Sequence, residues 1–332
     1  MSRFLLFNPW NDLALAANNP HYTPPASALQ MAADLSDLSR LWSEDIPWGW
    51  SPLQVRLMRE AGVPDDLLPT SEQLAEYRAF ASRQTAVRLL ERLRATWPEP
   101  FRSGQLVGES VWCESEDAVR KAVKGYGDKA MLKAPWSGSG RGVHPVSDGL
   151  TEKDLAWVRR TLQRQGGVEV EPFYQRTQDF AMEFWAEKGQ VRYEGLSLFT
   201  TTDGGVYNGN LVATEEEKER RLSQYVSLPL LHEVRDRLLH LLNTSDIPSW
   251  YRGPFGIDLM VVACPPNFQL SIFNFHPLVE MNFRMTMGWI ALQLSRHLTS
   301  DESRLFRIFQ KEGHYFSEMT PLNDYLVDNI SQ

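Results

Sequence analysis

The chain has 332 residues, a formal net charge of −8, 42% hydrophobic and 23% charged positions. This is the composition of an ordinary globular protein with room for two or three lobes. The acidic balance argues against nucleic acid or an anionic membrane as the main partner. The two cysteines, Cys113 and Cys264, lie far apart without His or Cys nearby, so neither a disulfide framework nor a zinc site is expected.

The first stretch of the chain, MSRFLLFNPWNDLALAANN, does not read as a targeting segment. Its short apolar run is broken by Asn8, Pro9 and Asp12. No later stretch approaches the roughly 20 apolar residues that a membrane span requires. We therefore expect a cytoplasmic protein.

In chain order, the first expected elements are a buried strand at 3–7, ended by Asn-Pro-Trp-Asn-Asp, and a mixed segment of helical periodicity and breakers over 26–80. An amphipathic helix at 82–97 and a short Ser-capped helix at 115–127 follow. A strand at 129–135 then leads into a glycine-rich loop. The sequence GVHPV after this loop predicts a returning strand.

The second half of the chain predicts more strand than helix. A helix capped by Thr151 precedes a segment, 168–213, whose alternation predicts several antiparallel strands. Charged helical sequence follows over 214–226 and 232–242. The block that starts at Pro254 predicts two long apolar strands and then a helix from about residue 287.

The glycine-rich loop, SGSGRG, is the first candidate site. Three glycines let main-chain N–H groups approach an anion, and Lys133 lies just before them. A flexible surface turn is the alternative. The sequence lacks GxxxxGK[ST] and leads into a strand instead of a helix, which excludes a Walker A loop and a dinucleotide fingerprint. A glycine-rich hairpin that folds over a phosphate chain remains.

A second candidate site is acidic. Glu280, Asn282 and Arg284 lie two apart and alternate with apolar residues, so on a strand they share one face. Asp258 interrupts the preceding apolar run, and pairing of the two strands would place it opposite Glu280 and Asn282. Carboxylate and amide oxygens suit Mg²⁺, and two close carboxylates repel each other without a cation. An edge strand that exposes these groups to water is the alternative.

A lysine on a strand, a glycine-rich flap and a later D…E-x-N-x-R pair of strands resemble, in this order, the ATP-grasp superfamily over roughly residues 80–300. The resemblance implies an α/β (α+β) ATP-grasp fold in which the lobes sandwich a nucleotide. It divides the chain into an N-terminal, pre-ATP-grasp-like α/β lobe (1–80), a small lobe with the flap (81–167) and a large lobe with the Mg/ATP site (168–332).

The cofactors that the resemblance implies are ATP and Mg²⁺, with Mn²⁺ as an alternative metal. Its implied metal ligands are Asp258, Glu280 and Asn282. Its implied catalytic residues are Lys133, Arg284 and Arg141. Its implied nucleotide-binding residues run from a helix start through the flap to an adenine-gripping hinge: Arg83, Lys133, Ser137, Gly138, Ser139, Gly140, Gly142, Glu171, Pro172, Phe173, Tyr174 and Asp179.

Several of these assignments have alternatives. Arg83 and Arg141 are both explained equally simply as cations that face water. Arg284 is a candidate for the acyl-phosphate oxyanion or for an acceptor carboxylate. Asp179 stands where the family often has a ribose-binding acid, but the match there requires an extra residue.

The implied activity is that of an ADP-forming carboxylate–amine ligase, in which ATP activates a carboxylate as an acyl phosphate and an amine displaces phosphate. A small-molecule kinase on the same fold and a non-catalytic nucleotide-binding protein are the alternatives. The expected partners are an amino-acid-like or peptide-like carboxylate and amine, without nucleic acid or membrane; a homodimer is left open. Candidates for the second substrate are Asn8, Asp12, Asn18, Asn19, His21, Tyr22, Tyr207, Asn208 and Asn210.

Overall fold

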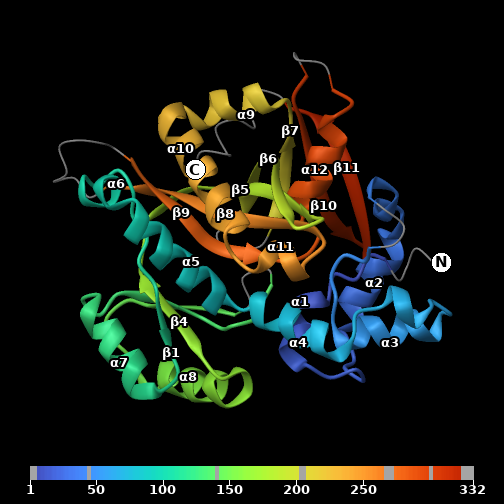
Figure 1. Ribbon diagram of the computed structural model, residues 1–332, viewed down its shortest axis with the longest axis horizontal. Helices are drawn as coiled ribbons and strands as arrows, with labels where there is room; N and C mark the ends of the chain where they lie inside the picture. The colour runs from blue at the N-terminus through green and yellow to red at the C-terminus, as the bar shows by residue number, and fades with distance from the viewer. Residues whose placement is uncertain are drawn as a thin grey trace.

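The computed structural model describes residues 6–42, 46–138, 142–201, 207–264, 273–298 and 302–322. These residues form a group of N-terminal helices, a four-stranded sheet and a seven-stranded sheet, with every strand pairing in the two sheets antiparallel. In Figure 1 the large sheet lies above, with the small sheet at the lower left and the N-terminal helices at the lower right. The α+β fold class that the sequence predicts is confirmed.

The described residues between 6 and 80 are helical. Their elements are α1 (Asn11–Ala17), α2 (Ala26–Asp34), the 3-10 helix η2 (Ser36–Leu41), α3 (Pro52–Glu60), the 3-10 helix η3 (Asp65–Leu67) and α4 (Ser71–Phe80). They contain no strand, in contrast to the α/β lobe expected from the sequence. The strand predicted at 3–7 lies largely outside the described residues. Its last members, Leu6 and Phe7, are buried beside Trp48, which donates its N–H to the Leu6 carbonyl oxygen.

The small sheet has the strand order β1-β4-β2-β3. Its members are β1 (Val111–Cys113), β2 (Ala130–Lys133), β3 (Val143–Val146) and β4 (Val168–Pro172). Strands β2 and β3 form the predicted hairpin around the glycine loop. Strand β4 pairs with both β1 and β2, because Val168 and Val170 complete the apolar core of this sheet. Strand β4 thus belongs to the small sheet, whereas the sequence analysis assigns residues from 168 onward to the large lobe.

Two helices, α7 (Glu116–Gly125) and α8 (Glu152–Gln165), pack beside the small sheet and enclose its core. Both start where the sequence predicts. The Ser115 side chain accepts the N–H of Ala118, and Thr151 and Asp154 form a reciprocal capping box.

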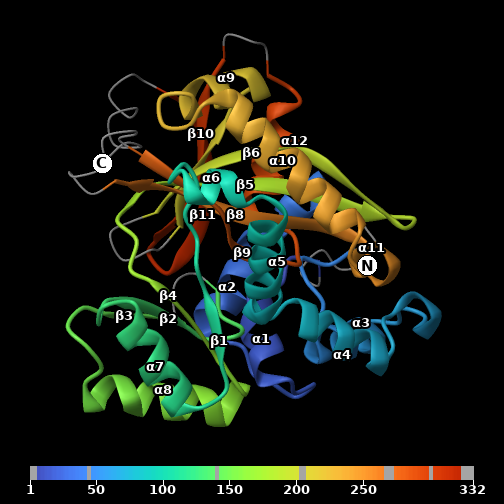
Figure 2. The ribbon, with the colours of Figure 1, turned by 60° about the vertical axis from the view of Figure 1, so that its left-hand side comes forward.

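Helix α5 (Arg83–Thr96) lies between the two sheets, as Figure 2 shows, and the short α6 (Pro98–Arg102) follows it. The Ser82 side chain caps the first turn of α5. Its buried side chains, which include Leu89, Leu90 and Leu93, join the core of the large sheet. Since Arg83 is the first residue of this helix, it is held at the junction between the sheets.

The large sheet has the order β11-β10-β7-β6-β5-β8-β9. Its strands are β5 (Arg176–Glu187), β6 (Gln190–Thr201), β7 (Tyr207–Val212), β8 (Gly253–Ala263), β9 (Phe273–Asn282), β10 (Arg304–Lys311) and β11 (His314–Pro321). The helices that accompany it are α9 (Glu215–Leu222), α10 (Leu228–Asn243), α11 (Ile247–Trp250) and α12 (Met287–Ser295). None of the helices in the described part of the chain is long and apolar enough to cross a membrane.

The two faces of the large sheet differ in chemistry. On β8, Phe255, Ile257 and Leu259 are buried and belong to the main core with α5 and α10. Asp258 lies between them in sequence, so its side chain projects from the opposite face. The alternation of strand side chains thus places the polar residues of β8 and β9 together on the face that carries the candidate site.

Candidate functional site

The acidic residues of β8 and β9 meet as the sequence predicts. Asp258 is the register partner of Glu280, and Gly256 is the partner of Asn282. The Asn282 amide donates to Asp258 Oδ2 over 3.1 Å. This pairing converts a spacing of 22 residues in the sequence into one cluster of oxygen atoms on the sheet.

The electrostatics of this cluster favour a cation. Burial, Glu280 and Glu183 together raise the pKa of Asp258 to about 8 against the opposing effect of Arg284. Within the described ranges, no third His, Cys, Asp or Glu completes a metal-binding group with Asp258 and Glu280. The donors predicted from the sequence, two carboxylates and the Asn282 amide oxygen, lie together here and are of the kind that Mg²⁺ binds alongside water and substrate phosphates.

Arg284 joins this cluster to the N-terminal helices. Its Nε donates to Asp12 Oδ1 over 2.9 Å, its Nη2 to Asn282 Oδ1 over 3.0 Å, and its Nη1 to the Met285 carbonyl oxygen over 3.1 Å. Burial lowers the pKa of Arg284, but Asp12, with Glu280 and Asp258, more than offsets this, and the pKa is raised overall. The guanidinium is thus a fixed positive charge beside the oxygen cluster.

Arg83 connects the glycine loop to the same cluster. Its Nη1 donates to the Ala134 carbonyl oxygen and to Ser137 Oγ, both over 2.5 Å, and its Nη2 donates to Glu280 Oε1 over 2.7 Å. Its Nε lies 3.9 Å from Glu169 Oε2. Only 4% of the side chain is exposed, so the alternative of a cation that faces water does not hold for Arg83.

Lys133 occupies the end of β2 and is buried against two carboxylates. Its Nζ lies 2.8 Å from Glu171 Oε1 and 3.9 Å from Glu169 Oε1. Burial lowers the pKa of Lys133, but Glu169 and Glu171 raise it above its usual value overall. Together with Arg83 and Glu280, these residues form a continuous chain of ion pairs from the small sheet to the large sheet.

Glu169 is a member of this chain that the sequence analysis missed. It is buried, and burial raises its pKa to about 7 against the opposing effect of Lys133. The signal was present in the alternation of VEVE at 168–171, because a strand places Glu169 and Glu171 on one face.

The described part of the glycine loop needs its glycines. A Cβ on Gly138 would meet a carboxylate oxygen of Asp12 closer than real Cβ contacts allow, and one on Gly142 would meet the Ser137 side chain equally closely. Close approach of the loop to neighbouring groups therefore explains both positions. Three other predicted loop residues lie outside the described residues: Ser139, Gly140 and Arg141.

The base of the loop is anchored by Trp136. Its Nε1 donates to the Arg78 carbonyl oxygen over 2.8 Å, and the Arg78 guanidinium carbon lies 3.5 Å from the ring centroid. The Trp136 N–H donates to Gln165 Oε1 over 3.0 Å. Helices α4 and α8 thus both hold the segment that leads into the loop.

The expected adenine hinge, 171–174, spans the last two residues of β4 and the two residues after it. Phe173 is 52% exposed, and the Tyr174 hydroxyl accepts the N–H of Glu109 over 3.0 Å. The Pro172 residue pairs with Ala130 at the end of β4. Asp179, the expected ribose ligand, forms an ion pair with Arg176 over 2.8 Å, and burial raises its pKa.

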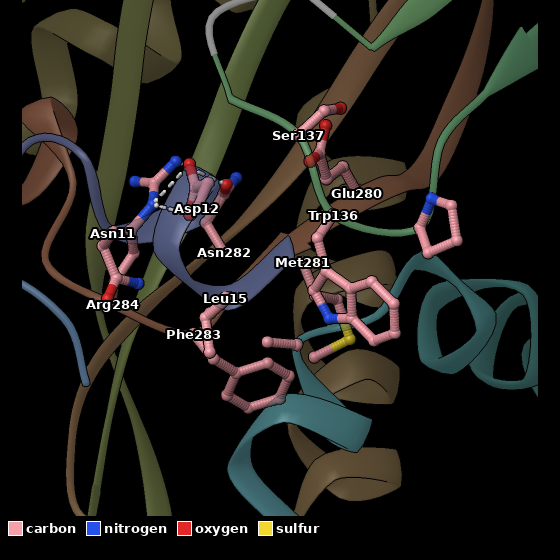
Figure 3. A pocket seen from close by; sticks show the side chains of 12 residues that line it. Asn11, Asp12, Leu15, Trp136, Ser137, Glu280, Met281, Asn282, Phe283 and Arg284 are labelled. Carbon is pink, nitrogen blue, oxygen red and sulfur yellow. Dashed lines mark hydrogen bonds and ion pairs between the residues drawn. The ribbon is translucent and has the colours of Figure 1, made fainter. Parts of the chain in front are cut away.

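A pocket opens where α1, the glycine loop and β9 meet (Figure 3). Figure 3 shows Asp12 and Arg284 joined by dashed lines, with Ser137 and Glu280 beside each other. Apolar side chains of Leu15, Trp136 and Phe283 lie on another side of it. The complete lining is Asn11, Asp12, Leu15, Ala81, Pro135, Trp136, Ser137, Glu280, Met281, Asn282, Phe283 and Arg284.

Among the candidates for a second substrate, Asp12 lines this pocket. Asn8 instead donates to the Gly49 carbonyl oxygen in the interior, and Asn19 accepts the N–H of His21 in a turn. Asn210 donates to Ser197 Oγ beneath α12, and Asn208 donates to Thr200 Oγ1. The contacts of these four asparagines and of His21 are those typical of turn and core residues.

Glu183 is a further buried carboxylate on the site face that the sequence analysis missed. It is the register partner of Gly256, which in turn pairs with Asn282, and the side chains of Glu183 and Thr286 lie over this glycine. Thr286 Oγ1 donates to Glu183 Oε1 over 2.8 Å. Burial raises the pKa of Glu183 to about 7.

The Glu183→Gln variant is expected to weaken the pH dependence of stability. Because the folded pKa lies above the usual value of 4.5, this carboxyl contributes full stability below about pH 4.5 and loses it as the pH rises through 7. The loss amounts to up to about 3 kcal/mol in the free energy of unfolding. The neutral amide removes it, so the variant should gain stability relative to the parent at pH 8 but not at pH 4.5.

Urea denaturation in EDTA at these two pH values measures the effect. Glu91→Gln, at an exposed position of α5, is the matched control. An identical stability difference between Glu183→Gln and the parent at both pH values would contradict the assigned pKa.

Comparison with known proteins gives matches in structure alone. No protein-family model matches the chain, and no curated protein matches its sequence. Among solved structures, N5-carboxyaminoimidazole synthetase from Staphylococcus aureus, complexed with ADP, is 11% identical with a TM-score of 0.47, covering 82% of this chain and 74% of that one. A putative ATP-grasp superfamily protein from Archaeoglobus fulgidus is 13% identical with a TM-score of 0.43, covering 84% and 75%. ATP-grasp proteins are among the structures that this chain resembles.

A third match is biotin carboxylase from Campylobacter jejuni in a complex with a β-γ-ATP ligand, 15% identical with a TM-score of 0.42. It covers 70% of this chain, which spans only 51% of the carboxylase. At identities of this size, the activity of the chain has to be argued from its own residues.

Proposed function

We propose that the chain is an ATP-grasp enzyme, an ATP- and Mg²⁺-dependent ligase that activates a small carboxylate as an acyl phosphate. An amine-type nucleophile then takes the acyl group, and ADP and phosphate are released. The observation that carries this proposal is the chain of ion pairs from Lys133 through Glu169 and Arg83 to Glu280, which links a glycine loop to an acidic cluster.

The residues have the charges that phosphoryl transfer needs. Lys133 and Arg83 are buried cations next to the glycine loop, and Arg284 lies on the other side of the acidic cluster. Fixed cations of this kind neutralise the negative charge that builds on the transferring phosphoryl oxygens. We assign phosphate contacts to Lys133 and Arg83, and stabilisation of the acyl phosphate to Arg284.

The metal would be held by Asp258, Glu280 and Asn282. When bound, Mg²⁺ supplies Lewis-acid stabilisation of phosphate charge. The protein must release groups to bind it, because the Asn282 amide oxygen accepts from Arg284 and Glu280 accepts from Arg83. In the same way, Lys133 must exchange Glu171 for a phosphate oxygen.

The rest of the nucleotide site is proposed from sequence position. The loop residues from 137 to 142 would cover the phosphates and exclude water from the acyl phosphate. Arg141 would contribute a further cation. Glu171 and the main chain of 172–174 would contact adenine, and Asp179 the ribose.

Calorimetric titration with a non-hydrolysable ATP analogue, with and without Mg²⁺, tests the nucleotide site. We expect Mg²⁺-dependent binding that Lys133→Met weakens by about tenfold or more, because a charge-assisted contact to phosphate is lost. Lys121→Met, at an exposed position of α7, is the matched control. Failure of the parent protein to bind the analogue under either condition would overturn the proposed function. Product analysis then separates a ligase, which releases phosphate, from a kinase, which leaves a stable phosphoester.

A further inference from the structure

The pocket between α1 and β9 presents opposite charges side by side. Asp12 comes from the first turn of α1, whereas Arg284 follows β9, and the two are joined across the pocket wall. Both side chains are partly exposed, at 24% and 17%. The pair therefore connects two parts of the fold at a place that a small molecule can reach.

Arg284 has hydrogen-bond partners other than Asp12, so it relies less on Asp12 than Asp12 relies on it. Arg284 also donates to Asn282 and to the Met285 carbonyl oxygen, so it stays in place when Asp12 is withdrawn. Asp12 forms an ion pair with Arg284 over 2.9 Å. A ligand with a single charge would satisfy one member of the pair and leave the other uncompensated, which is costly in a partly buried site. A ligand that carries an ammonium and a carboxylate satisfies both.

The remaining wall of the pocket sets the character of the ligand's side chain. Leu15 and Phe283 are buried side chains at this wall, and Trp136, at the base of the glycine loop, lines the pocket with them. An apolar wall of this kind favours a short aliphatic or aromatic group over a charged one.

The orientation follows from the neighbours of Arg284. Arg284 binds Asn282, and Glu280 lies next along the same face of β9. A carboxylate on Arg284 therefore lies beside the proposed phosphate and metal site, whereas an ammonium on Asp12 lies on the N-terminal side. An amino group held by Asp12 stays protonated and cannot act as the nucleophile.

We propose that this pocket binds a zwitterionic α-amino acid with a small apolar side chain, as the carboxylate substrate of the ligase. This inference rests on the proposed function. A carboxylate oxygen of the amino acid attacks the γ-phosphorus, the bond to the β-γ bridging oxygen breaks, and ADP leaves. The nitrogen of the second substrate then attacks the acyl carbon, the C–O bond to phosphate breaks, and the nitrogen loses its proton to solvent.

The acyl phosphate can be trapped without knowledge of the second substrate. The protein is incubated with ATP, Mg²⁺ and hydroxylamine and each of the protein L-amino acids in turn, and aminoacyl hydroxamate is measured by mass spectrometry. The deaminated and decarboxylated analogues of the best amino acid are then compared with it; for leucine these are 4-methylpentanoate and isopentylamine. We expect hydroxamate from an apolar amino acid, little from its deaminated acid, and no competition from the amine.

Asp12→Asn tests the assignment of the ammonium site. We expect kcat/KM for the amino acid to fall about tenfold to a hundredfold, because a charge-assisted contact is lost, with KM carrying most of the change. Activity with the deaminated acid should not fall. Asp65→Asn, which removes an exposed partner of Arg59, is the matched control. A merely structural role for Asp12 would lower both activities equally.

The two proposals fail in different ways. Absence of ATP-analogue binding removes the proposed function itself. Binding of the analogue together with hydroxamate from simple carboxylates but from none of the amino acids overturns the zwitterion site alone, as does analogue binding without hydroxamate from any of these compounds.

Discussion

Glu280→Gln is expected to abolish metal-dependent turnover while leaving the fold nearly intact. The side chain is 23% exposed, and the amide keeps the shape of the carboxylate and an oxygen that can accept from Arg83. The variant loses one of the two negative charges of the metal-binding cluster. Since metal coordination contributes several kcal/mol to the stabilisation of phosphate charge, the rate should fall by about a hundredfold or more.

The change also alters the free protein in a predictable direction. Glu280 raises the pKa of Asp258, so a neutral amide lets the pKa of Asp258 fall below its value of about 8. Repulsion within the cluster decreases, whereas Arg83 loses a full ion pair. These effects oppose each other, and we expect a small net change in the free energy of unfolding.

Turnover and its Mg²⁺ dependence are measured by ADP release, with urea denaturation as the check on folding. Glu318→Gln, at the outer strand β11 where Glu318 pairs with Arg307, is the control. Retained activity with an unchanged Mg²⁺ requirement would show that the metal lies elsewhere. Lost activity together with lost folding would instead assign Glu280 a structural role.

The acidic half of the site was predictable because its residues lie close together in the sequence, on two successive strands. A strand has a side-chain period of two, so Glu280 and Asn282 share a face of β9 whatever the rest of the fold does, whereas Arg284 lies just beyond the end of this strand. The register of Asp258 with Glu280 needed only the pairing of two neighbouring strands. The hairpin of β2 and β3 and the capped helices α5, α7 and α8 rest on equally local patterns.

The links between distant segments were not predictable. Arg83 binds Glu280, which is 197 positions away, and Arg284 binds Asp12, which is 272 positions away. Neither pairing leaves a periodic or compositional trace in the sequence. The position of β4 in the small sheet has the same origin, because a strand of VEVEP fits either sheet until its partners are known.

The N-terminal part shows what a local apolar pattern can predict. An apolar run such as RFLLF predicts a buried strand, and Leu6 and Phe7 are indeed buried. At Leu6, the carbonyl oxygen accepts the N–H of Trp48. Burial was thus predictable from composition, whereas the hydrogen-bonding partner was not.

Arg83→Ala is expected to cause the largest loss of stability among the changes considered. The guanidinium has two carbonyl or hydroxyl acceptors at the loop base and two carboxylates, Glu280 and Glu169, around it. Its removal leaves Glu169, which is 1% exposed, with Lys133 as its remaining nearby cation. Loss of one partner from a buried ion pair costs about 3–5 kcal/mol, because the other charge stays buried without compensation.

Urea denaturation at pH 7 measures this loss, and Arg92→Ala, on the exposed side of the same helix, is the control. Arg83→Lys keeps the charge but not the fork that reaches Ser137 and Glu280 together, so it should fall between the parent and Arg83→Ala. If Arg83→Ala were as stable as the control, the buried ion-pair chain would contribute nothing to folding. Nucleotide affinity that falls in Arg83→Lys, with stability largely kept, would locate the function of this residue at the phosphates.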